Sequence, residues 1–163
     1  MKAKSTLILV PLAAMWVDEL VNILVDHQLV EWGILPRTVP GLLGIPLSPL
    51  IHGSPSHALS NSIPFVVLGG AVLMQGARRY VLLSVLVIFA GGGIVWLMAR
   101  ASFHVGASGV VFGYFGYLLA RGWYEHTFKA IAIAVVALVL YGGVLLGLAP
   151  TSSEISWEGH LAG

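Results

Sequence analysis

Residues 80–99 read YVLLSVLVIFAGGGIVWLMA, an uncharged apolar run bounded by Arg79 and Arg100. An α-helix rises 1.5 Å per residue, so about 20 residues cross the roughly 30 Å hydrocarbon core of a bilayer. The run is continuous and lacks the apolar-polar alternation of transmembrane β-strands. This stretch therefore predicts a membrane-spanning helix and an all-α fold.

The composition of the whole chain agrees with this prediction. Of the 163 residues, 58% are hydrophobic and only 9% are charged, and the mean hydropathy is +0.93. Soluble domains carry about 25% charged residues, so we expect a single polytopic membrane domain over residues 1–163. Eight Lys and Arg with a net charge of +1 provide no basic face for nucleic acid. The absence of cysteine excludes disulfides, thiolate metal sites and cysteine nucleophiles.

Further apolar runs predict the course of the chain through the bilayer. Together with residues 80–99 they give five full spans and the start of a sixth at His160; the other four are Leu7–Val25, His57–Gln75, Ser108–Ala120 with its flanks, and Phe128–Leu148. The connection 26–56 is rich in proline and in apolar residues. We therefore expect it to lie in the membrane interface, packed on the helix bundle.

The positions of the cations predict the orientation, since short cytoplasmic loops are enriched in Lys and Arg. With the N-terminus in the cytoplasm, the outer connections hold only Arg37 and Arg100. The inner connections then hold the other six cations, which are Lys2, Lys4, Arg78, Arg79, Arg121 and Lys129.

Polar side chains are costly inside a membrane, and in this topology several of them gather at the outer ends of the spans. His57 and Asn61 are four residues apart and share one helix face. Ser108 is predicted to begin a helix, where free N–H groups favour negative charge. His160 starts the last span at the same depth. These residue types at one depth predict a Ser-His dyad, with His57, Asn61 and the Ser108 N–H as oxyanion donors. No carboxylate is placed to complete a catalytic triad.

Glycines give the predicted dyad room to form. Gly109, Gly113 and Gly116 leave a bare stripe on the fourth span, and Gly163 shares a face with His160, so two backbones can approach closely. Phe112 lies one turn below Ser108 and could stack on the imidazole.

The ordered motifs resemble those of the rhomboid intramembrane serine proteases along nearly the whole chain. The resemblance is carried by 33-GILPR-37 with 41-GL-42 and 44-GI-45, by His52 with His57 and Asn61, by 106-GASG-109, and by Gly159-His160 with Gly163. It implies that Ser108 is the nucleophile, that His160 is the general base, and that His57 and Asn61 are oxyanion donors. His52, Gly106, Gly109 and Phe112 would be supporting residues.

The resemblance also implies a cellular setting. Family members cleave transmembrane protein substrates near the membrane surface without a metal or cofactor, so the expected partners are such substrates and the lipid bilayer. The expected location is the bacterial inner membrane, with the N-terminus in the cytoplasm.

Two features depart from the family pattern. Phe112 stands where some members have tyrosine. The sequence also ends three residues after His160, from which we expect a truncated reading frame that lacks most of the sixth helix. In that case His160 would have nothing to hold it at the depth of Ser108.

Other interpretations remain open from the residues. A lone intramembrane serine usually bonds its own helix backbone. A small transporter would also place polar groups at one depth, and a catalytically silent rhomboid-like protein would bind transmembrane clients without cutting them. Bis-histidine haem ligation leaves Asn61 unexplained, and the His-Glu-x-x-His string of a metalloprotease does not occur.

The remaining polar residues have simpler interpretations. His27, His104 and His126 lie in connections, where solvated or interfacial histidines are expected. Asp18, Glu19 and Asn22 in the first span indicate either a functional group or a buried hydrogen-bond network.

Overall fold

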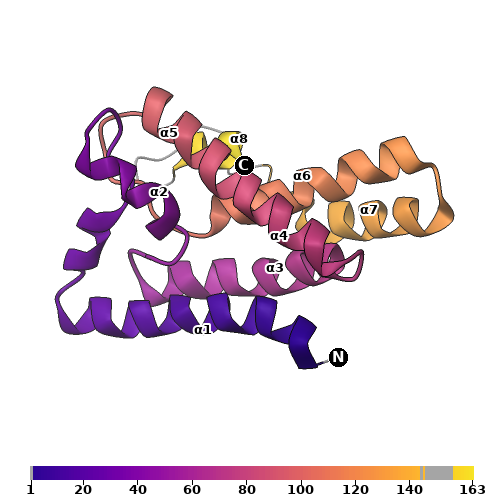
Figure 1. Cartoon of the computed structure of the whole chain (residues 1–163), viewed down its shortest axis with the longest axis horizontal. Helices are drawn as coiled ribbons and strands as arrows, with labels where there is room; N and C mark the ends of the chain where they lie inside the picture. The colour runs from indigo at the N-terminus through magenta and orange to yellow at the C-terminus, as the bar shows by residue number, and fades with distance from the viewer. Residues whose placement is uncertain (1, 144, 146–155) are drawn as a thin grey trace.

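The computed structural model describes residues 2–143, 145 and 156–163, and every regular element within them is helical (Figure 1). In chain order these elements are α1 (Lys2–Leu24), η1 (Gln28–Trp32), η2 (Pro40–Leu42), α2 (Gly44–Leu47), α3 (Pro55–Leu73), α4 (Ala77–Leu86), η3 (Val87–Gly91), α5 (Gly92–Met98), α6 (Ser108–Glu125), α7 (Phe128–Tyr141) and α8 (Trp157–Ala162). The all-α prediction is therefore confirmed.

Within the part of the chain that the structure describes, three of the predicted spans form helices long and apolar enough to cross a membrane. They cover Ser5–Leu24, Pro55–Leu73 and Ala77–Met98. The third is one continuous helical rod made of α4, the π-helical turn η3 and α5. It contains residues 80–98 of the predicted span, and Ala99 is its C-cap. Helix α6 has 18 residues, and α7 is a shorter apolar helix of 14 residues. Most of residues 142–148, the predicted end of the last full span, lie outside the described residues.

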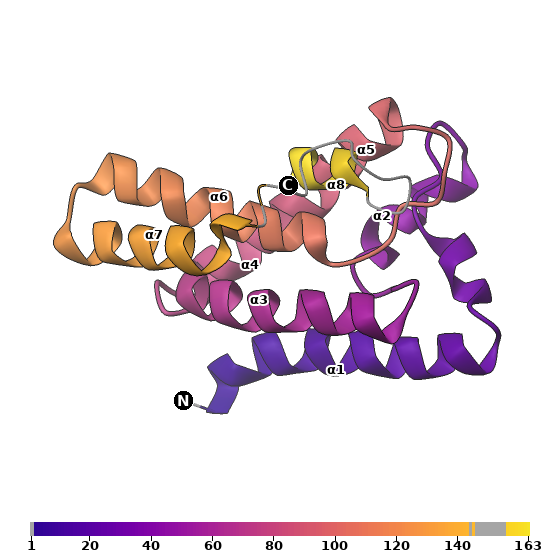
Figure 2. The ribbon, with the colours of Figure 1, turned by 180° about the vertical axis from the view of Figure 1, so that it is seen from behind.

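Helix α6 lies at the centre of the bundle. It packs against α3, α4, α7 and α8, while α1 lies beside α3 on the far side (Figures 1 and 2). Tyr114 of α6 is fully buried, and its hydroxyl lies 2.7 Å from the hydroxyl of Ser84. This hydrogen bond gives each hydroxyl a partner, which lipid or apolar side chains could not provide. The surrounding core is apolar and includes Phe65, Leu68, Val72, Phe115 and Leu118.

The helices differ in whether a side chain caps their N-terminus. Ser54, Thr127 and Ser156 cap α3, α7 and α8, each accepting a backbone N–H three residues further on. Helix α6 begins without such a cap, because its N-cap residue is Ala107.

The first connection, residues 26–54, is a compact structure and packs on the bundle as predicted. The Arg37 guanidinium donates to the carbonyl of Ala99 at 2.8 Å, and the Trp96 indole donates to the carbonyl of Thr38 at 2.8 Å. These bonds fix the connection to the end of α5. Both figures show it at the end of the molecule opposite the N-terminus and the α3–α4 and α6–α7 connections.

Gly44 allows two backbone segments of this connection to touch. A Cβ on Gly44 would overlap the backbone of Gly33, whereas a Cβ on Gly53 would meet nothing within 4 Å. We predict that Gly44→Ala lowers the free energy of unfolding by about 1–3 kcal/mol, since the overlap must be relieved by moving backbone. Thermal unfolding midpoints in detergent measure this, with Gly53→Ala as the matched control. Equal midpoints for the two variants would contradict the packing described here.

Candidate functional site

A cavity of about 690 Å³ lies between the start of α3, residues 100–105, α6 and α8. Ser108, His160, His57 and Asn61 all line it, although the first and last of them in the chain are separated by more than a hundred residues. The structure thus brings together the four side chains that the sequence marks as chemically active.

Ser108 is the first residue of α6. The helix has no side-chain cap and no acidic residue in its first turn, so the positive end of its dipole is not neutralised there. Gly106, two residues earlier, has a φ of +111°, and a Cβ at this position would lie 2.7 Å from Nε2 of His57. Only glycine allows both the turn and the close approach of His57.

The Asn61 amide is a buried donor facing the same place. Its residue is 6% exposed, and within the described chain its Nδ2 has no hydrogen-bond partner. A Cβ on Gly106 would lie 3.4 Å from this nitrogen, so the amide sits beside the turn that leads into Ser108. Leaving a buried N–H unpaired costs about 1–3 kcal/mol, so its presence calls for an explanation.

His160 lies on α8 and is held from two sides. Its ring stacks on Phe112 of α6, with centroids 4.5 Å apart and planes at 16°. Its backbone N–H donates to the carbonyl of Ser156 at 3.2 Å. The expectation that His160 has nothing to hold it beside Ser108 is therefore wrong.

Glycines let α8 lie directly against α6. A Cβ on Gly109 would lie 3.2 Å from the carbonyl oxygen of Gly159, and one on Gly163 would overlap the Gly109 carbonyl. Gly113 instead packs against the side chain of Val87, and a Cβ on Gly116 would meet nothing within 4 Å. The predicted glycine stripe is thus used for backbone contact with α8 at the N-terminal end of α6.

His52 supports the turn before Ser108. Its ring is fully buried, and it lies edge-on to His57 with centroids 4.9 Å apart. Nδ1 lies 3.1 Å from the carbonyl of Leu50, and Nε2 accepts the N–H of Ala107 at 3.3 Å. A carbonyl can only accept, so Nδ1 carries the proton and the ring is neutral. Burial lowers the pKa of His52 to about 4.

Asn22 of the first span belongs to this network. Its amide donates to the carbonyl of His52 at 2.8 Å and accepts the N–H of Leu29 at 3.0 Å. The buried-network interpretation is therefore correct for Asn22. Glu19 is also fully buried, but in the part of the chain that the structure describes its carboxylate oxygens have no partner.

His104 was expected to be solvated or interfacial, and the solvated alternative is wrong. Its residue is 4% exposed, and its ring nitrogens contact Ser156 and the carbonyl of Arg100. The sequence could not predict this burial, because the bonding partner Ser156 is 52 residues further along the chain. His126, by contrast, is exposed as expected.

Comparison with known proteins gives one family and several relatives. The family model described as Rhomboid domain matches residues 41–163. An uncharacterized protein of Mycobacterium tuberculosis is 35% identical over 168 residues, covering 98% of this chain and 70% of the relative. An uncharacterized protein of Mycobacterium leprae is 34% identical, covering 96% of this chain and 65% of the relative. RHOMBOID-like protein 4 of Arabidopsis thaliana is 28% identical, covering 69% of this chain and 29% of the relative.

The neutral state of His52 predicts acid sensitivity. Its pKa in the folded chain lies below the ordinary 6.5, so protonation is disfavoured by folding. The neutral ring therefore contributes about 3 kcal/mol to the free energy of unfolding above pH 6.5. This contribution is lost as the pH falls from 6.5 to about 4. Thermal unfolding between pH 4 and 8 should show a shallower pH dependence in His52→Gln than in the wild type. The exposed His126→Gln variant is the control, and an unchanged slope in His52→Gln would rule out the assignment.

Proposed function

The chain belongs to the rhomboid family, and on that premise we propose that it is an intramembrane serine protease. The proposed reaction is hydrolysis of a peptide bond in or beside the transmembrane segment of a membrane protein. The observation that carries the proposal is the shared cavity at the start of α6, which is lined by Ser108, His160, His57 and Asn61.

Ser108 is the proposed nucleophile. Its hydroxyl oxygen attacks the carbonyl carbon of the scissile bond while His160 takes the hydroxyl proton. The stack on Phe112 and the close backbone contact of Gly109 with Gly159 support this pairing, because they fix the ring plane and the distance between the two helices.

Three groups are proposed to stabilise the oxyanion of the tetrahedral intermediate. They are the backbone N–H of Ser108, the Asn61 amide and the His57 ring. No free energy is needed to reorganise these donors if they already point at the position where the negative charge develops. Among the described residues the Asn61 N–H has no partner, which supports this role, since a donor that binds the oxyanion must be available before the reaction.

The remaining steps use the same groups. His160 returns its proton to the leaving amine nitrogen, which breaks the peptide bond and leaves Ser108 acylated. A water molecule then loses a proton to His160 and attacks the ester carbonyl. His160 returns this proton to the Ser108 oxygen as the ester bond breaks, which releases the carboxylic acid and restores the serine and the neutral base. Neither step requires a metal or a cofactor.

The membrane setting follows the same proposal. The cavity is lined in part by the first connection, through Val30, Gly53 and Ser54. The N-terminus and the α3–α4 and α6–α7 connections, to which the sequence assigns six of the eight cations, lie at the other end of the molecule (Figure 1). The positive-inside rule then supports an N-terminus in the cytoplasm and a cavity open toward the outer side. The mycobacterial relatives support a bacterial inner membrane as the location.

We predict that Ser108→Ala or His160→Ala abolishes cleavage of a tagged transmembrane reporter by protein reconstituted in vesicles. Each substitution removes one partner of the proposed dyad. Ser56→Ala, an exposed serine in the first turn of α3, is the matched control and should cleave at the wild-type rate. Reporter cleavage that persists in Ser108→Ala would exclude this serine as the nucleophile.

Asn61→Ala should reduce kcat about 10²- to 10³-fold, because one of several oxyanion donors is lost. It should also raise the thermal unfolding midpoint or leave it unchanged, since a buried unpaired amide is removed. Single-turnover cleavage rates and melting curves measure the two effects. A large loss of stability with normal kcat would show that Asn61 is structural.

A further inference from the structure

His104 links three segments that are distant in sequence. Its backbone N–H and carbonyl form two hydrogen bonds with Ile34, at 2.9 and 3.0 Å. Its ring lies between the carbonyl of Arg100 and the hydroxyl of Ser156. We propose that His104 is a positioning residue that holds the start of α8, and through it His160, against the cavity. This inference rests on the proposed function.

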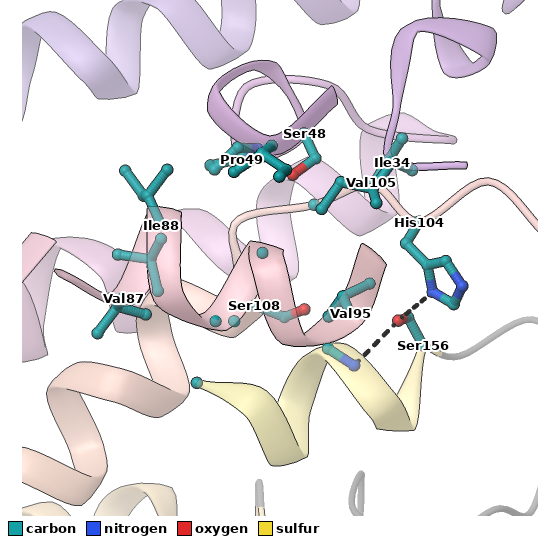
Figure 3. A pocket seen from close by; sticks show the side chains of 18 residues that line it. Ile34, Ser48, Pro49, Val87, Ile88, Val95, His104, Val105, Ser108 and Ser156 are labelled. Atoms are coloured by element: carbon teal, nitrogen blue, oxygen red, sulfur yellow. Dashed lines mark hydrogen bonds between the residues drawn. The ribbon is translucent and has the colours of Figure 1, made fainter. Parts of the chain in front are cut away.

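The bonding partners fix the tautomer of the ring. Nε2 lies 3.1 Å from the carbonyl oxygen of Arg100, which can only accept, so Nε2 carries the proton. Nδ1 is then an acceptor and receives the hydroxyl hydrogen of Ser156 at 2.6 Å. Figure 3 shows the ring projecting toward Ser156 and the dashed bonds that join them to the start of α8. Burial lowers the pKa of His104, which agrees with a neutral ring beside Arg100 and Glu158.

Ser156 passes this restraint on to α8. With its hydrogen given to His104, the hydroxyl oxygen accepts the N–H of Gly159 at 3.2 Å and so caps the helix. The Ser156 carbonyl accepts the N–H of His160 at 3.2 Å. The orientation of the cap therefore decides where His160 lies.

Helix α8 depends on such outside contacts. It has six residues, and a helix this short is not stable on its own. Beyond Ser156, its first turn is held by an ion pair between Arg100 and Glu158 at 3.6 Å. Arg100 and His104 belong to the same connection, so residues 100–104 hold the start of α8 as one unit.

Two substitutions of His104 separate the Ser156 bond at Nδ1 from the contacts at Nε2, which faces the Arg100 carbonyl and lies 3.5 Å from the Ser102 hydroxyl. Asparagine places an acceptor where Nδ1 lies and can keep the Ser156 bond, whereas glutamine reaches the position of Nε2 and can keep only the Arg100 bond. We expect His104→Asn to cleave the reporter within about threefold of the wild-type kcat. His104→Gln and His104→Ala should lose about 10- to 100-fold in kcat with KM nearly unchanged, because a shift of about 1 Å at His160 slows the reaction without weakening substrate binding.

The pathway through Ser156 is tested by a double-mutant cycle. Ser156→Ala removes the cap and the His104 bond together, so adding His104→Ala should cost less than a further twofold in kcat. Multiplicative losses in the double variant would overturn the proposal. So would equal activity of the asparagine and glutamine variants, or a glutamine variant more active than the asparagine one.

A second readout does not depend on catalysis. In protein labelled with ¹⁵N-histidine, the His104 signals should show a protonated Nε2 and an unprotonated Nδ1, and both should change in Ser156→Ala. A protonated Nδ1 in the neutral ring would overturn the proposal. If the wild type shows no Ser108-dependent cleavage, the proposed function is wrong. The NMR measurement of the His104 tautomer then tests by itself whether His104 holds α8.

Discussion

Four hydrogen bonds hold residues 104–107 against the first connection, and the position of the candidate site depends on them. Two join His104 to Ile34, the third runs from the Gly106 N–H to the carbonyl of Ser48 at 2.8 Å, and the fourth from the Ala107 N–H to the His52 ring. The polar backbone before α6 is thereby satisfied by the first connection and not by a side-chain cap. The first amides of α6 stay available at the cavity, where they can meet negative charge.

Two buried histidines act as structural parts, one in the first connection and one in the connection before α6. His52 and His104 are buried, each with one ring nitrogen facing a carbonyl and the other accepting a hydrogen. A neutral imidazole can form both bonds, while a charged one would be desolvated and would lose its acceptor. In a chain with so few charged residues, neutral histidines connect distant segments at a smaller cost than ion pairs would.

Hydropathy and local chemistry predicted much of this molecule. The apolar run at residues 80–99 is sufficient to predict a spanning helix, and the spacing of His57 from Asn61 places both on one face of α3. Phe112 lies one turn from Ser108, which predicts its stack on His160, and the structure has that stack. Such inferences succeed because they use helix periodicity, which is local.

The inferences that failed required knowledge of distant partners. His104 gave no sign of burial, because Ile34 and Ser156 lie far from it in the chain. Gly113 and Gly116 fit the same helical stripe as Gly109, yet only Gly109 meets α8, since the contact depends on where a six-residue helix docks. Membership of the rhomboid family favours a protease over a small transporter, and the geometry adds which side chains share a cavity.

Covalent labelling tests the central claim most directly, because it identifies the reactive side chain without reference to any substrate. The wild-type protein in detergent is treated with a fluorophosphonate, digested, and analysed by mass spectrometry. We expect one adduct, on Ser108, whose rate of formation falls sharply in His160→Ala. An adduct on another serine, or labelling of Ser108 at the same rate without His160, would contradict it.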